Sequence, residues 1–185
     1  MDTGLLILRI VVGLLLVGHG TRRLFGWFGG RGLAGTARYF GSVGYWPPKF
    51  MTSFAISAEI VGGAALAAGF MTRLAAAVVI GAMVNAVAIH WRNGMWAADN
   101  GFEYPLVTAA AAATLAFTGA GTASLDARVG LGGASIEAGL FTVALGLLAG
   151  AAFLISRAAA RSEGGPVWEP KPNPNPKALP EKLAA

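Results

Sequence analysis

The sequence of 185 residues contains no cysteine and only two histidines. Without cysteine the chain forms no disulfide, no zinc–thiolate site and no iron–sulfur cluster held by thiolates. The two histidines, His19 and His90, stand alone, with neither an HExxH motif nor paired carboxylates beside them. The sequence therefore predicts no metal site and gives little support for a haem pocket.

Charged residues are scarce as well. They make up 12% of the chain, against roughly 25% in an ordinary soluble domain, whereas hydrophobic residues make up 55%. A chain this short cannot bury so much apolar surface in a water-soluble core. The excess must face lipid, so we expect an integral membrane protein. The net charge of +5 then reports orientation in the membrane, and no nucleic-acid partner is expected.

Five apolar segments have about the length that a membrane-spanning helix needs, roughly 17–25 residues. They cover residues 5–22, 50–70, 74–91, 104–119 and 136–155. The first lacks a positive n-region and a small-x-small cleavage site, so we expect a retained helix rather than a signal peptide. The sequence thus predicts an all-α membrane protein, a four-helix transmembrane bundle plus a fifth C-terminal transmembrane helix.

We divide the chain into a transmembrane domain (1–127), an additional transmembrane helix (128–161) and a proline-rich tail (162–185). The tail holds six of the nine prolines, and its 171–177 stretch favours an extended, polyproline-like conformation. It is expected to be a disordered end or, alternatively, a strap that docks a soluble partner.

Lysine and arginine gather in alternate connecting segments. One set of connections holds Arg22, Arg23, Arg31, Arg38, Lys49, Arg92, Arg157 and Arg161. The other set holds only Arg73 and Arg128. Because positive residues favour the cytoplasmic side, we predict an external N-terminus and a cytoplasmic C-terminus.

Ionisable residues inside apolar segments usually face the interior of a bundle. Arg9 and Glu59 share their helix faces with small residues, and we predict that they form a buried ion pair. A larger set converges on the cytoplasmic half and forms our candidate ligand site: His19, Arg23, Trp27, Glu59, Asn85, His90 and Glu103. Glu59 and His19 are also the candidates for a catalytic role, although none is assigned. The alternative is that these groups only make interhelical hydrogen bonds and interface anchors.

Residues 30–35 match the pattern GxGxxG. No strand precedes them and no βαβ unit fits between these helices, so we expect no dinucleotide site there. The glycines instead permit a turn close to the membrane surface.

An ordered set of motifs resembles the DoxX-like family of membrane proteins. The motifs are His19-Gly20, Arg23 to Gly30, Gly32 to Thr36, Glu59 with Gly62-Gly63, Thr72-Arg73, Gly101 to Glu103 and Ser124 to Asp126. The resemblance covers residues 4 to about 127 and implies a four-helix membrane core, so the fifth helix and the tail lie beyond it. It also implies a bacterial inner-membrane protein that serves quinone-linked oxidoreductases or oxidative-stress and thiol homeostasis complexes.

Three functions follow as hypotheses. The first is a membrane subunit of a redox complex, in which His19 binds a quinone oxygen, Glu59 relays a proton and Trp27 stacks on the ring. The second is a non-enzymatic anchor that holds cytosolic enzymes through the basic first loop and the tail. A small-molecule transporter ranks last, since the helices are too few for an inverted repeat unless the chain forms a homo-oligomer. We expect no tightly bound cofactor, so electrons would come from a protein partner or a diffusible quinone.

Overall fold

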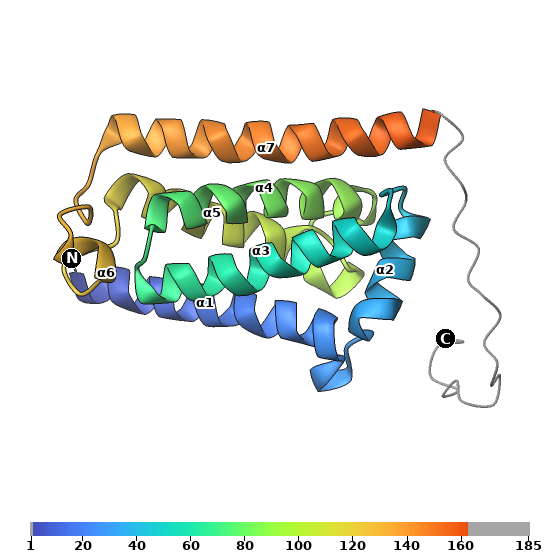
Figure 1. The fold of residues 1–185 in the computed structure, drawn as a ribbon, viewed down its shortest axis with the longest axis horizontal. Helices are drawn as coiled ribbons and strands as arrows, with labels where there is room; N and C mark the ends of the chain where they lie inside the picture. Colours follow the sequence, from blue (N-terminus) through green and yellow to red (C-terminus); the bar gives the residue numbers. More distant parts are fainter. Residues whose placement is uncertain (1, 163–185) are drawn as a thin grey trace.

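Long helices lying alongside one another dominate the computed structural model, which describes residues 2–162. They are α1 (Asp2–Phe25), α3 (Pro48–Ala68), α4 (Thr72–His90), α5 (Glu103–Thr118) and α7 (Ile136–Ser162) (Figure 1). No strand occurs among the described residues. The predicted all-α fold is confirmed, and the tail from residue 163 onward lies outside the described residues.

Short helices cap the two ends of the bundle. At one end, which we call the α2 end, lie η1 (Trp27–Gly29), α2 (Gly32–Ser42), η2 (Trp91–Asn93) and η3 (Ala97–Asp99). At the other, the α6 end, lie the N-terminus and α6 (Leu125–Arg128) (Figure 1). Because consecutive long helices run in opposite directions, all the connections rich in arginine meet at the α2 end.

Four helices are long and apolar enough to cross a membrane: α1, α3, α4 together with η2, and α7. The remaining long helix, α5, has 16 residues. At about 1.5 Å per residue it measures about 24 Å, somewhat less than the roughly 30 Å of a hydrocarbon core. It carries the chain from the α2 end to the α6 end and packs against α4, α7 and α1 (Figure 1).

Glycines allow the helices to approach closely at two interfaces. Gly13 of α1 faces Gly63 of α3, and a Cβ at either position would collide with the other's carbonyl oxygen. Gly81 of α4 meets Gly146 and Gly150 of α7 less closely, since a Cβ on Gly81 would lie 3.1 Å from the carbonyl oxygen of Gly146. In lipid no hydrophobic effect drives helices together, so their association depends on close packing of this kind at small residues. Helix α7 is therefore packed into the bundle rather than appended to it.

Candidate functional site

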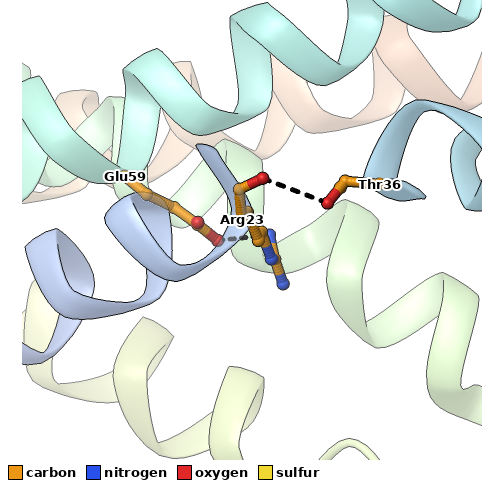
Figure 2. Close-up of polar contacts among 3 residues, drawn as sticks. All are labelled: Arg23, Thr36 and Glu59. Carbon is orange, nitrogen blue, oxygen red and sulfur yellow. Dashed lines mark hydrogen bonds and ion pairs between the residues drawn. The ribbon is translucent and has the colours of Figure 1, made fainter. Parts of the chain in front are cut away.

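An ion pair between α1 and α3 forms the centre of the candidate site. Glu59 lies in the middle of α3 and is 3% exposed. Its Oε1 accepts a hydrogen bond from Nη1 of Arg23, in the last turn of α1, at 2.5 Å (Figure 2). The second carboxylate oxygen, Oε2, is buried and has no partner among the described residues.

Helix α2 holds the arginine end of this pair in place. Thr36 donates from Oγ1 to the carbonyl oxygen of Arg23 at 3.3 Å and to that of Gly32 at 2.8 Å (Figure 2). Thr36 is itself only 5% exposed. The end of α1 and the start of α2 are thereby joined directly beside the Arg23–Glu59 pair.

The predicted Arg9–Glu59 pair is wrong. Arg9 points to the α6 end, where it is 1% exposed and its Nη2 donates to the carbonyl oxygen of Ala123 at 2.6 Å. The reason is the register of α1 on α3, which places Gly20 against the Cβ of Glu59. Arg9 lies eleven residues from Gly20, about 16 Å along the helix, whereas Arg23 lies one turn away.

A stacked pair of rings adjoins the ion pair. The rings of His19 in α1 and Tyr104 in the first turn of α5 lie 4.5 Å apart between centroids, with 22° between their planes. The hydroxyl of Tyr104 is buried without a hydrogen-bond partner among residues 2–162. Its polar surroundings are the side chain of Thr108, one turn further along α5, and those of Glu59 and Arg23. We call His19, Arg23, Glu59 and Tyr104 the Glu59 cluster.

The other predicted site residues make separate contacts at the α2 end. His90 Nδ1 lies 2.7 Å from the carbonyl oxygen of Asn100. Glu103 Oε2 accepts a hydrogen bond from the backbone N–H of Ala97 at 2.9 Å. Trp27 is 55% exposed and stacks on Phe25. These contacts hold loops together and place an aromatic ring at the surface, so the Glu59 cluster is smaller than the predicted site.

Asn85 belongs to a different hydrogen-bond network, which joins α4 to α7. Its Oδ1 accepts from the hydroxyl of Tyr45 at 2.7 Å, and its Nδ2 donates to the carbonyl oxygens of Gly81 at 2.9 Å and Gly150 at 3.1 Å. Tyr45 follows α2 and is 3% exposed. Burial raises the pKa of Tyr45, so its hydroxyl keeps the proton that it donates.

Two buried residues with clear roles escaped the sequence analysis. Tyr45, which donates to Asn85, was not among the predicted site residues. Asp126 was read only as part of a family motif, yet it is 5% exposed and both of its carboxylate oxygens accept backbone N–H groups at the start of α4, those of Met71 at 2.7 Å and Thr72 at 2.8 Å. Within residues 2–162, no group of three or more His, Asp or Glu side chains could hold a metal ion.

Comparison with known proteins finds one family model and one relative that resemble parts of this chain. Residues 4–91, which include Arg23 and Glu59, match the DoxX family model. The chain is also 27% identical over 125 residues to a Bacillus subtilis (strain 168) protein named "Putative oxidoreductase CatD", covering 68% of this chain and 86% of that one. No solved structure is significantly similar to the chain.

Tyr104 and α7 lie beyond the part of the chain that matches the DoxX model. The Glu59 cluster therefore combines three residues of the segment that matches the DoxX model with one residue of α5. The fold is that of a multi-pass membrane protein. Within it, the Glu59 cluster lies where the last turn of α1 and the first turn of α5 meet the middle of α3, toward the α2 end of the bundle.

Proposed function

We propose that this DoxX-like membrane protein works in redox chemistry and binds a quinone head group at the Glu59 cluster. One observation carries the proposal: Glu59 Oε2 and the Tyr104 hydroxyl are both buried and both lack a hydrogen-bond partner among the described residues. Buried polar groups are almost always hydrogen-bonded, so two unpaired groups in one cluster indicate a place for a polar ligand.

The chemistry of the cluster suits a flat ring that carries two carbonyl oxygens. The Tyr104 hydroxyl can donate a hydrogen bond to one such oxygen, and a ring N–H of His19 can donate to the same head group. Glu59 can carry a proton in an otherwise apolar surrounding, while Arg23 holds its other oxygen. Reduction of a quinone to a quinol takes up protons as well as electrons, and this chain would handle the protons.

The electrons would come from elsewhere. The chain has no cysteine for an iron–sulfur cluster, and its lone GxGxxG sequence spans the connection into α2 rather than a strand and a helix. A membrane subunit of an oxidoreductase complex in the bacterial inner membrane fits these features, and the name of the Bacillus subtilis relative is in keeping with it. We expect the purified chain to show no stoichiometric haem or flavin absorption.

The test is quinone binding by the full chain in mild detergent, with short-chain benzoquinone and naphthoquinone as probes. Glu59→Gln and Tyr104→Phe should each weaken binding about tenfold, the effect of losing one hydrogen bond to a charged or buried partner. Glu103→Gln and Tyr39→Phe are matched controls at the same end of the bundle and should bind normally. Equal binding by all four variants, or none by the wild-type chain, would remove the proposal.

The anchor hypothesis then becomes the preferred one. It is supported by the basic side chains at the α2 end, among which Arg31 and Arg38 lie between α1 and α3, and Lys49 lies in the first turn of α3. Copurifying proteins that remain bound in Glu59→Gln, together with absent quinone binding, would support an anchor in place of a quinone site.

A further inference from the structure

A groove opens at the α2 end between the last turns of α4 and α7. Its volume is about 590 Å³, within the range of small-molecule sites. Three arginines line it: Arg92, Arg157 and Arg161. The remaining wall consists of the apolar residues Ala88, Leu154 and Ala158 together with Ser162. Among residues 2–162 no carboxylate lines this groove, so the charge that the described residues give it is positive.

Two of the arginines are held in place by a single backbone carbonyl. The carbonyl oxygen of Val43 accepts from Nε of Arg157 and from Nη2 of Arg161, both at 2.7 Å. Arg161 lies over Gly44, where a Cβ would collide with its guanidinium. Arg157 also lies over the ring of Tyr45, 5.2 Å from the centroid. The turn after α2 thus fixes two positive charges that would otherwise repel each other one helical turn apart.

These charges lack a counter-ion within the described part of the chain. The salt bridge between Arg23 and Glu59 is the only one found among residues 2–162. A carbonyl oxygen satisfies hydrogen bonds but carries no full negative charge. Three guanidinium groups around one groove therefore attract an anion, and paired N–H groups of arginine match the oxygens of a phosphate.

The position of the groove decides which anion fits best. Leu154 and Ala158 belong to α7, the most apolar of the helices that could cross a membrane, and the arginines lie at its end. Leu147, two turns before Leu154 on the same face, is 49% exposed. An apolar strip therefore leads away from the arginines toward the middle of the membrane. A free phosphate gains nothing from contact with such a strip, whereas the acyl chain of a lipid can pack along it.

We propose that the groove binds an anionic phospholipid, with its phosphate at Arg92, Arg157 and Arg161 and an acyl chain along α7. Basic pockets between transmembrane helices bind anionic head groups in this way. The proposal does not depend on the quinone site, which lies among α1, α3 and α5. It assigns α7, which lies outside the DoxX-matched residues, a role in lipid recognition.

The test is native mass spectrometry of the full chain in mild detergent. The probes are phosphatidylglycerol and phosphatidylcholine with identical acyl chains, and inorganic phosphate alone. Wild-type protein should retain phosphatidylglycerol in preference to phosphatidylcholine. Arg92→Gln should weaken phosphatidylglycerol binding about fivefold, the usual contribution of one arginine near an anionic surface. Arg92 makes no hydrogen bond within residues 2–162, so this variant should fold normally.

Two further variants separate a built site from diffuse attraction. Arg38→Gln removes an exposed arginine of α2 that does not line the groove, and it should bind like the wild type. Ala158→Trp fills the groove without removing charge and should weaken binding as Arg92→Gln does. The proposal fails if phosphatidylcholine binds equally well, if Arg38→Gln and Arg92→Gln weaken binding alike, or if inorganic phosphate displaces the lipid completely at equal concentration.

Discussion

Arg23 and Glu59 form an ion pair whose partners differ in exposure, 34% for the arginine side chain and 4% for the carboxylate. The difference makes the pair unequal in its response to mutation. Removing Arg23 leaves a buried carboxylate without a cation, and stranding a buried charge costs about 3–5 kcal/mol. Removing Glu59 leaves an arginine that reaches water or lipid head groups. We therefore predict that Arg23→Gln destabilises the protein more than Glu59→Gln does.

The measurement for this prediction is thermal unfolding of both variants in one detergent, followed by helical circular dichroism. The double variant Arg23→Gln/Glu59→Gln should recover part of the loss seen in Arg23→Gln, because no charge is then stranded. Equal losses in the two single variants would show that exposure does not govern the pair.

Gly69 is predicted to be far more sensitive to substitution than Gly130, although both have a positive φ. Its φ is +64°, and a Cβ there would collide with the guanidinium of Arg9 and with Ser124. Gly130, at φ +76° on the same end of the bundle, has no atom within 4 Å of a Cβ position. Both alanine substitutions carry the left-handed penalty of about 1–2 kcal/mol. Only Gly69→Ala must also displace a fully buried arginine, so it should lower the midpoint of thermal unfolding well below that of Gly130→Ala.

Tyr45 should contribute to stability through its hydroxyl group. Tyr45→Phe leaves Oδ1 of Asn85, a partly buried acceptor, without its hydrogen bond, which costs about 1 kcal/mol. The matched control is Tyr39→Phe, since no hydrogen bond of the Tyr39 hydroxyl occurs among the described residues. Unfolding in detergent should shift for Tyr45→Phe and stay unchanged for Tyr39→Phe. A shift of the same size in both variants would show that the hydrogen bond from Tyr45 to Asn85 is not the cause.

Membrane orientation can be read by chemical labelling, because the chain contains no cysteine and an introduced one is unique. Val129 near α6 is 69% exposed and Trp96 at the α2 end is 62% exposed, so the two positions are well matched. With the basic α2 end in the cytoplasm, Val129→Cys should react with a membrane-impermeant maleimide in intact cells. Trp96→Cys should react only after the cells are permeabilised. The reverse pattern would invert the topology predicted from the arginines.

The sequence patterns predicted the helices well, but they predicted poorly which side chains of different helices contact one another. The apolar segment 104–119 was expected as a full transmembrane helix, and α5 does occupy Glu103–Thr118. The first segment, expected to end near residue 22, continues to Phe25. Those extra residues keep Arg23 in helical geometry and aim it at Glu59. Helix ends are the least certain part of a prediction from sequence patterns. Here the additional residues at the end of α1 include Arg23, the arginine that pairs with Glu59.

The sequence by itself determined that this chain is a helical membrane protein, because the length of an apolar segment and its scarcity of charge decide whether it is stable as a helix in lipid. It also determined which end collects the arginines, since helices of similar length must alternate in direction. The tertiary structure alone decided which cation meets Glu59. The contact of Gly13 with Gly63 and of Gly20 with Glu59 sets the register of α1 on α3, and that register brings Arg23 to the carboxylate and carries Arg9 away to the α6 end.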